Sequence, residues 1–272
     1  MIHTALTIAG SDCSGGAGVQ ADIKTMSALG VYAMSVITAV TAQNTLGVAA
    51  VEDISPEVIQ AQMDAVFGDI PPDAVKIGMV SRKESIAAIA DKLAQYQPQN
   101  VVLDPVMVSK SGCHLLQPDA VQTLIKRLLP LSRLVTPNIP EAEVLTGGAV
   151  TAENWEDAAR AIYQMGPDLV LIKGGHLKGE AADLLYDGSS FEVFPAARID
   201  TRHTHGTGCT LSSAIAACLA KGAAPRDAVR KAKDYITGAI ARGIPLGHGV
   251  GPVHHFYRLW QEESPAAGQQ KG

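Results

Sequence analysis

The sequence predicts an α/β fold in which a mostly parallel central sheet carries helices on both faces. Short apolar runs rich in β-branched residues alternate with longer segments of helical spacing along most of the chain. Such alternation is typical of βαβ units, which cover both faces of a parallel sheet. The composition agrees, because 272 residues that are 47% hydrophobic and 18% charged can bury a large core.

Six apolar runs are predicted to be buried strands, and five segments between them are predicted to be helices. In the second helical segment, Val58, Ile59, Met63, Val66 and Phe67 fall on one helix face. The predicted strands are residues 5–9, 35–39, 75–77, 101–103, 134–136 and 169–172. The predicted helices are residues 18–29, 56–67, 83–96, 118–129 and 155–165.

The last third of the chain is predicted to add a hairpin and further helices. Residues 183–186 and 191–194 flank the turn sequence Asp187-Gly188-Ser189-Ser190, which favours an antiparallel hairpin. The helices expected after it are residues 210–221, 225–242 and 253–260.

Domain organisation and cellular setting follow from what the sequence lacks. No repeat or linker divides it, so residues 1–260 are expected to form one domain, followed by a disordered polar tail at 261–272.

A net charge of −5, no basic stripe and 4% aromatic residues argue against nucleic-acid binding. No apolar run is long enough to span a membrane, and the first residues lack the basic region of a signal peptide. Four widely spaced cysteines suit a reducing cytoplasm; they are Cys13, Cys113, Cys209 and Cys218.

Glycines and polar residues recur where the predicted strands end. Ligands of parallel sheets bind beyond the carboxyl ends of the strands, so these residues are expected to surround one site. They are residues 10–12, 43–44, 78–79, 104–105, 137–138 and 173–175.

The segment 204–213 predicts an anion site. Gly206, Thr207 and Gly208 precede Cys209 and an apolar helical run. Free N–H groups at a helix start bind anions, and the helix dipole there favours a cysteine thiolate. The alternative is a glycine-rich turn before a core helix that buries a small thiol.

Two polar residues are candidates for contacting a flat heterocyclic ligand. Asp22 lies one helical turn beyond the glycine-rich stretch 10–18, where it could accept a hydrogen bond from a ring amine. The alternative is a solvated first-turn carboxylate. The amide of Gln43 can both donate and accept, and so could recognise a ring edge, although it could also serve only to order a turn.

Carboxylates and a lysine at strand ends suggest nucleotide phosphates with magnesium. Asp104 and Glu141 offer the oxygen ligands that magnesium prefers, and Lys173 suits a phosphate contact. Alternatively, Glu141 and Glu143 are ordinary first-turn acids, and Lys173 is a lysine at the margin of the sheet.

Seven motifs, in this order, resemble those of the bacterial hydroxymethylpyrimidine/phosphomethylpyrimidine kinases, which belong to the ribokinase-like superfamily. The similarity covers about residues 4–258. The motifs are Gly-Ser-Asp-Cys-Ser-Gly-Gly-Ala-Gly, Thr-Ala-Gln-Asn-Thr, Lys-Ile-Gly-Met, Asp-Pro-Val-Met, Thr-Pro-Asn-x-x-Glu, Lys-Gly-Gly-His and His-Gly-Thr-Gly-Cys-Thr.

The resemblance implies a three-layer α/β/α sandwich that uses ATP and magnesium, with a monovalent cation such as K⁺ as a further expectation. The activity it implies is two successive phosphorylations, of 4-amino-5-hydroxymethyl-2-methylpyrimidine and then of its monophosphate, for thiamine diphosphate synthesis. It also implies roles for individual residues. The pyrimidine would be contacted by Gly10, Asp22, Gln43, Met79 and Val106, and the magnesium would be held by Asp104 and Glu141. The ATP would be contacted by Lys173, Asn138 and Thr207. The transferred group would be surrounded by Gly206, Thr207, Gly208 and Cys209.

Cys209 stands where the wider superfamily usually has an aspartate base. By the resemblance, its thiolate would accept the hydroxymethyl proton during the first phosphorylation, since a helix start lowers a thiol pKa. One departure from the family pattern is Cys113-His114, where an aspartate or similar residue is expected after the glycine.

Two other functions compete with this one. A pyridoxine/pyridoxal kinase of vitamin B6 salvage would share the fold and also act on a hydroxymethyl-bearing ring. A non-catalytic binding module is disfavoured by the combination of Lys173, Asp104, Glu141 and the glycine-rich loop. A homodimer in the cytoplasm is expected by analogy with other proteins of this fold.

Overall fold

A nine-stranded, mostly parallel sheet is the framework of the protein. The structure is a computed structural model that describes residues 2–107, 115–176 and 181–260. Within these residues the strand order is β3-β2-β1-β4-β5-β6-β7-β8-β9, and only the pairs β2–β3, β7–β8 and β8–β9 are antiparallel. The strands are β1 (Thr4–Asp12), β2 (Tyr32–Asn44), β3 (Gly47–Asp53), β4 (Ala74–Ile77), β5 (Val101–Leu103), β6 (Leu134–Val135), β7 (Leu169–Lys173), β8 (Asp183–Tyr186) and β9 (Phe191–Phe194).

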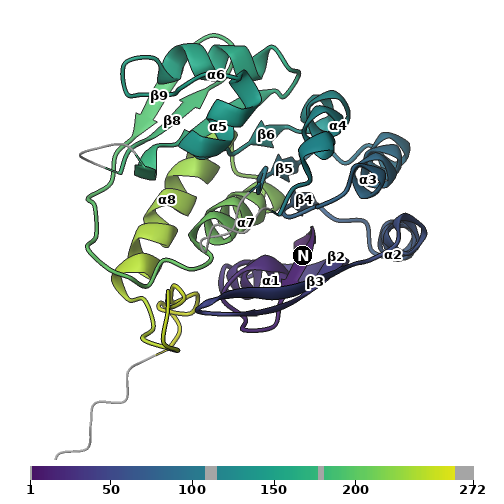
Figure 1. Ribbon diagram of the computed structural model, residues 1–272, viewed down its shortest axis with the longest axis horizontal. Helices are drawn as coiled ribbons and strands as arrows, with labels where there is room; N and C mark the ends of the chain where they lie inside the picture. The colour runs from purple at the N-terminus through teal and green to yellow at the C-terminus, as the bar shows by residue number, and fades with distance from the viewer. Residues whose placement is uncertain (1, 108–114, 177–180, 261–272) are drawn as a thin grey trace, which may run out of the picture.

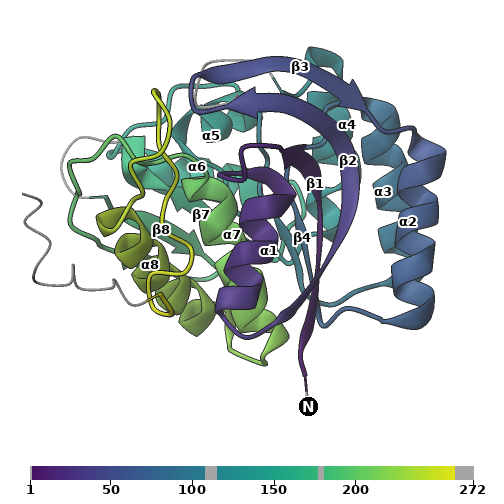
Figure 2. The ribbon, with the colours of Figure 1, turned by 90° about the horizontal axis from the view of Figure 1, so that it is seen from below.

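Helices cover both faces of this sheet, as the two views in Figures 1 and 2 show. One face carries α2 (Pro56–Asp69), α3 (Lys83–Tyr96), α4 (Val121–Arg127), α5 (Ile139–Thr146) and α6 (Trp155–Tyr163). The other carries α1 (Gly18–Ala28), α7 (Thr207–Ala220) and α8 (Pro225–Ala241). The predicted three-layer α/β/α architecture is therefore confirmed.

The central strands are mostly apolar because each one contributes to two cores. In β5, Val101 and Leu103 pack with the α2–α6 layer, whereas Val102 between them packs with the α1, α7 and α8 layer. Successive side chains of a strand point to opposite faces, so a strand between two helical layers is apolar at most positions. The buried Lys76 of β4 is an exception, and it pairs with Asp22.

The strand at the sheet edge differs from the prediction. The chain from 35 to 39 was expected to form a short strand, but β2 runs to Asn44 and pairs with β3, which the sequence did not indicate. Most of β3 is exposed. An edge strand held mainly by backbone hydrogen bonds leaves little trace in a hydrophobic pattern.

The segment predicted as a last helix, 253–260, forms turns instead. Its backbone makes four-residue turns, such as the one closed by Tyr257 N–H to His254 O at 3.3 Å, and the Phe256 and Trp260 rings stack. Helix nucleation is costly, so a segment this short depends on its packing rather than on its own helix propensity. Helix α7 begins three residues earlier than predicted, at Thr207, and residues 118–129 divide into α4 and two short 3-10 turns.

Two further expectations concern membranes and the polar tail. In the part of the chain that the structure describes, no helix combines the length and apolar character needed to cross a membrane. The predicted tail at 261–272 and the Cys113-His114 departure lie outside the described residues.

Candidate active site

The predicted site residues gather in one pocket of about 410 Å³ at the carboxyl ends of the parallel strands. Eleven residues to which the sequence analysis assigned a role line this pocket together with Cys209. Asp22, which was also assigned a role, does not line it. The eleven are Gly10, Gln43, Met79, Asp104, Val106, Asn138, Glu141, Lys173, Gly206, Thr207 and Gly208.

Two strand irregularities shape the pocket wall that the ends of β1 and β2 form. Residues 10–12 were predicted to follow the first strand, but they continue β1 beyond a register shift between Ala9 and Ser11. Gln43 likewise lies within β2, next to a register shift after Ala42. Such bulges redirect side chains locally, which brings both strand ends to the pocket wall.

The anion loop forms at the start of α7. Gly206 is the residue before the helix and has φ +80°, a conformation that favours glycine. A β-carbon there would overlap the carbonyl oxygen of Gly16, so the loop fits closely against the chain before α1. The N–H groups of Gly208 and Cys209 lie in the first turn of α7, which supplies no intrahelical acceptor and leaves them available to an anion.

Cys209 differs from the prediction in its acidity. Burial raises the pKa of its thiol to about 11, although the charge of Lys76 and the N–H of Gly18 act in the opposite direction. The sequence predicted a lowered pKa from the helix dipole. The burial penalty on a thiolate outweighs that dipole here.

Lys173 lies beside two carboxylates of the pocket wall. Its Nζ lies 2.7 Å from Asp104 Oδ1 and 3.8 Å from Glu141 Oε2. Asp104 is 1% exposed and also accepts hydrogen bonds from Thr136 and Ser212, each at 3.3 Å. The pair is fixed from several elements, so the lysine is a held cation of the pocket rather than a free surface charge.

Glu141 is both a first-turn acid and a pocket residue. Its backbone N–H donates to Asn138 Oδ1 at 2.9 Å, and its Oε2 accepts from the Asn138 N–H at 2.8 Å, which forms a capping box for α5. Burial, with the nearby charge of Asp104, raises its pKa to about 7 against the opposing charge of Lys173. Glu143 instead accepts from the Val150 N–H at 3.0 Å, a structural contact.

Asp22 is separated from the pocket and belongs to a buried ion pair. It is fully buried, and Lys76 Nζ lies 2.9 Å from its Oδ2. Thr7 and Ser213 donate hydroxyl hydrogen bonds to it at 2.6 and 2.7 Å. Both oxygens are therefore occupied by protein donors, which differs from the expectation that Asp22 contacts a ring amine and also from the solvated alternative.

Two pocket residues, Asp12 and His205, were given no individual role from the sequence, although Asp12 belongs to the stretch 10–12 and His205 to the segment 204–213. His205 Nε2 lies 2.8 Å from Asp12 Oδ2, and both residues line the pocket. Burial would raise the pKa of Asp12, but hydrogen bonds from His205, Ser14 and the Ala17 N–H lower it to about 2. Both residues stood inside the glycine-rich motifs, and that position was the only available signal.

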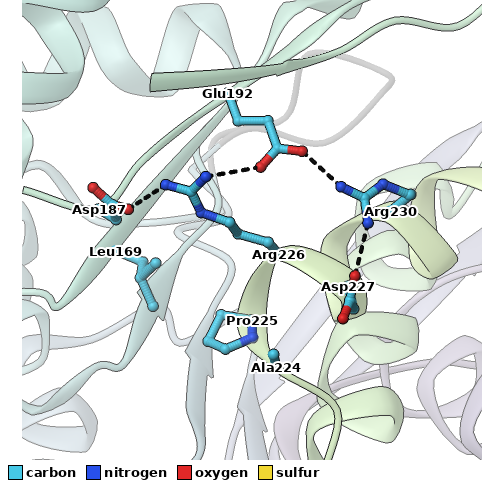
Figure 3. A pocket seen from close by; sticks show the side chains of 8 residues that line it. All are labelled: Leu169, Asp187, Glu192, Ala224, Pro225, Arg226, Asp227 and Arg230. Atoms are coloured by element: carbon cyan, nitrogen blue, oxygen red, sulfur yellow. Dashed lines mark hydrogen bonds and ion pairs between the residues drawn. The ribbon is translucent and has the colours of Figure 1, made fainter. Parts of the chain in front are cut away.

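A second pocket lies at the other end of β7. It measures about 620 Å³, and Figure 3 shows that its charged side chains face one another. Arg226 pairs with Asp187, and Arg230 pairs with Glu192 and Asp227. Because these charges are already paired, the cavity offers no concentrated charge to a ligand.

The carboxylates fit a magnesium ion only when phosphate oxygens complete its shell. Within the described ranges, no group of three or more His, Cys, Asp or Glu side chains could hold a metal by itself. Asp104 and Glu141 supply hard oxygens on one wall of the pocket. Magnesium commonly binds one or two carboxylates together with substrate phosphates, so this donor set is appropriate.

Comparisons with known proteins identify relatives along nearly the whole chain. The model of the family described as phosphomethylpyrimidine kinase matches residues 12–254. A hydroxymethylpyrimidine/phosphomethylpyrimidine kinase of Rhizobium meliloti is 58% identical over 267 residues, which cover 96% of this chain and 100% of the relative.

Two other similar proteins extend this picture. The thiamine biosynthesis bifunctional protein ThiED of Geobacter sulfurreducens is 53% identical over 92% of this chain, which spans 52% of that longer protein. Among solved structures, an ADP complex of Bacillus subtilis pyridoxal kinase has a TM-score of 0.89 at 42% identity, covering 95% of this chain and 100% of the other.

Proposed function

The chain belongs to the phosphomethylpyrimidine kinase family, and on that basis we propose how its pocket carries out two phosphorylations. The enzyme uses ATP to phosphorylate 4-amino-5-hydroxymethyl-2-methylpyrimidine and then converts the monophosphate to the diphosphate for thiamine diphosphate synthesis. The observation that carries the proposal is that one pocket is lined by the ends of β1 and β2, by Lys173 at the end of β7 and by the start of α7.

The pyrimidine lies against the ends of β1, β2 and β4 in this proposal. A β-carbon at Gly10 would stand only 3.1 Å from Met79 Sδ, so a larger residue there would crowd the wall against which the ring is proposed to lie. Gln43 offers an amide that can donate to and accept from the ring edge. Met79 and Val106 supply the apolar contacts on the ring faces.

The phosphates lie against Lys173 and the start of α7. Lys173 contributes a positive charge, and Asn138 and Thr207 contribute polar atoms of the same wall. The N–H groups at Gly208 and Cys209 stabilise the negative charge that develops on the moving phosphoryl group. A β-carbon at Gly208 would stand 3.3 Å from Asp104 Oδ2 and 3.5 Å from Lys173 Nζ, so a larger residue there would crowd these two pocket groups.

Asp104 and Glu141 would hold the magnesium ion in this proposal. The ion would neutralise phosphate charge when the nucleotide is bound. Burial raises the pKa of Glu141 to about 7. The attraction of a bound cation would favour the ionised carboxylate and so offset the cost of burying its charge. A monovalent cation such as K⁺ belongs to the proposal as a further activator.

Cys209 is proposed to accept the hydroxymethyl proton in the first step. The alcohol oxygen attacks the γ-phosphorus, the bond to the ADP oxygen breaks, and the proton moves to the sulfur. Because the pKa of this thiol is raised to about 11, the thiolate is a minor but strongly basic form at neutral pH. The second step needs no base, because its acceptor phosphate is already ionised.

Pyridoxal kinase activity is the second candidate, and the Bacillus subtilis structure is the observation that favours it. Both rings present a heteroatom edge and a hydroxymethyl group to Gln43. The pyrimidine kinase of Rhizobium meliloti is 58% identical and the pyridoxal kinase 42%, so the pyrimidine remains the main substrate of the proposal.

A coupled ATP assay with magnesium and hydroxymethylpyrimidine tests the function, with products followed by mass. Monophosphate followed by diphosphate is the expected result. Monophosphate alone, together with faster turnover of pyridoxine or pyridoxal at equal concentration, would move the protein to vitamin B6 salvage. The assay repeated without magnesium serves as the control for the metal.

The proposal also includes a homodimer that acts in the cytoplasm, with residues 1–260 as one kinase domain. The β2–β3 hairpin exposes Val40, Leu46 and Val51, and β3 ends the sheet within the described residues. An exposed apolar edge of this kind is suited to a second copy of the chain. Cys13, Cys209 and Cys218 are free thiols, as a reducing compartment favours. Light scattering during gel filtration measures the mass of the particle.

A further inference from the structure

His205 is held at three points immediately before the anion loop. Its backbone N–H donates to Gly251 O at 3.0 Å, and its carbonyl accepts from the Val253 N–H at 3.3 Å. Its ring Nε2 lies 2.8 Å from Asp12 Oδ2. With a 9% exposed side chain, His205 is fixed in place from two distant segments of the chain.

Asp12 is the other half of this contact and shapes the loop before α1. One oxygen accepts from the Ser14 N–H at 2.9 Å and the Ser14 hydroxyl at 2.7 Å. The other accepts from the N–H groups of Gly16 at 3.2 Å and Ala17 at 2.8 Å, and faces His205. With these donors and 2% exposure, the carboxylate is a fixed acceptor that requires a hydrogen on His205 Nε2.

The two loops joined by this contact touch directly. A β-carbon on Gly16 would overlap the His205 ring, and one on Gly206 would overlap the Gly16 carbonyl oxygen. At Gly16 and Gly206 the two loops meet without a side chain of either glycine between them. A shift of the loop that contains Asp12 is therefore expected to move the start of α7. The other neighbour of His205 Nε2 is Gln43 Nε2 at 3.3 Å, on the substrate side.

We propose that Asp12 and His205 are positioning residues for phosphoryl transfer, whose contact fixes the N–H groups at the start of α7 relative to the acceptor oxygen. This inference rests on the proposed function. The pair connects the wall that contains Gly10 and Gln43 to the loop Gly206–Cys209. Reacting groups must be aligned closely, and a displacement of about 1 Å can cost roughly 100-fold in rate.

The test compares His205→Phe, which removes the N–H, with His205→Gln, which places an amide N–H near the position of Nε2. For His205→Phe, kcat is expected to fall about 10- to 100-fold while the dissociation constant for hydroxymethylpyrimidine stays within about 3-fold. His205→Gln is expected to recover kcat to within about 5-fold of the wild type. His3→Phe is the matched control, because His3 lies just before β1 with a 39% exposed side chain.

Coupling between the partners is tested with Asp12→Asn and the double variant. If the two residues act through one contact, Asp12→Asn with His205→Phe is no slower than the slower single variant. Thermal unfolding of every variant is measured beside kcat. A merely structural role would lower stability, leave the kcat of the folded fraction unchanged and give no recovery with glutamine.

The outcomes separate this inference from the proposed function. An active wild type with unchanged kcat in His205→Phe, or full additivity in the double variant, overturns the positioning role alone. A wild type that phosphorylates neither hydroxymethylpyrimidine nor its monophosphate overturns the proposed function and this inference with it. Loss of kcat, recovery with glutamine and non-additivity together support the inference.

Discussion

At the scale of single residues, burial rather than sequence position decides the acidity of the pocket groups. Cys209 lies at a helix start, yet burial raises the pKa of its thiol to about 11. Glu141 lies in the first turn of a helix, yet burial beside Asp104 raises its pKa to about 7. Both groups share the environment of Lys173, and their charge states therefore depend on what occupies the pocket.

Replacing Cys209 with alanine separates the two phosphorylations. The first is expected to slow about 100-fold or more, because only the alcohol acceptor needs a base, and the second is expected to stay within about 5-fold. Product formation from hydroxymethylpyrimidine and from its monophosphate is measured separately, with Cys218→Ala as the control. Equal slowing of both steps would show that the thiol only fills space.

The pKa of about 11 also gives the direction of the pH dependence. A base is active when deprotonated, so the first phosphorylation is expected to quicken about tenfold per pH unit between about pH 7 and 10. Over the same range the second step should change little, which a pH series on each acceptor measures. A flat profile for the alcohol would contradict the base assignment.

The buried pair Asp22–Lys76 leads to a stability prediction. Both side chains are fully buried, and Lys76→Met would leave the Asp22 carboxylate without its counter-charge. A loss of about 3–5 kcal/mol in the free energy of unfolding is expected in urea titrations. The double variant Asp22→Asn with Lys76→Met should recover part of this loss. A single variant as stable as the wild type would show that the pair is dispensable.

At the scale of elements, short secondary-structure elements form the pocket wall that contains Glu141. Helix α5 spans only Ile139–Thr146, and it presents Glu141 to the pocket through a capping box with Asn138. Strand β6 before it has two residues. Elements this short depend on their caps and on packing, since propensity alone cannot hold them.

Removing the cap should therefore loosen α5. Asn138→Ala is expected to lower the free energy of unfolding by about 1 kcal/mol, because the Glu141 N–H loses its acceptor. Asn138→Asp keeps an acceptor oxygen and serves as the matched variant, with stability close to the wild type. Urea unfolding followed by circular dichroism measures both; equal losses in the two variants would contradict the capping explanation.

At the scale of the whole molecule, segments distant in sequence meet around the site. The loop 247–251 packs on the β2–β3 turn, where the Val250 N–H donates to Thr45 O at 2.9 Å. The next residues run past His205 and lead to His255, which is buried against α8. The C-terminal segment thus contacts both the β2–β3 turn and His205, which precedes the start of α7.

His255 should make this arrangement sensitive to acid. Burial, with the charges of Lys24, His254 and His205, lowers its pKa from 6.5 to about 4, and its Nε2 has no hydrogen-bond partner among the described residues. Below about pH 6.5 this histidine is protonated in the unfolded chain but stays neutral in the folded chain. The free energy of unfolding therefore falls as the pH drops from about 6.5 toward 4. Between about pH 7 and 5 the loss from this group is about 2 kcal/mol.

Urea unfolding at the two pH values measures that loss. In His255→Leu the difference between them is expected to shrink by about 2 kcal/mol, because the titrating group is gone. An unchanged difference would assign the acid sensitivity to other groups.

The sequence by itself determined most of the segments that form the central strands and the helices, the layered architecture and most of the pocket. It could do so because apolar periodicity marks elements buried on one or two faces, and because glycines and polar residues accumulate at the ends of parallel strands. Asp104, Lys173 and Gly206–Cys209 were found in this way, and the structure brings them together.

Only the tertiary structure decided features that depend on neighbours far apart in the chain. The pairing of Asp22 with Lys76, the raised pKa of Cys209 and the contact of Asp12 with His205 each join residues from different elements. The exposed strand β3 and the turns at 253–260 likewise follow from what surrounds them. Burial and long-range pairing are properties of the packed chain, and no local pattern encodes the partner across the fold.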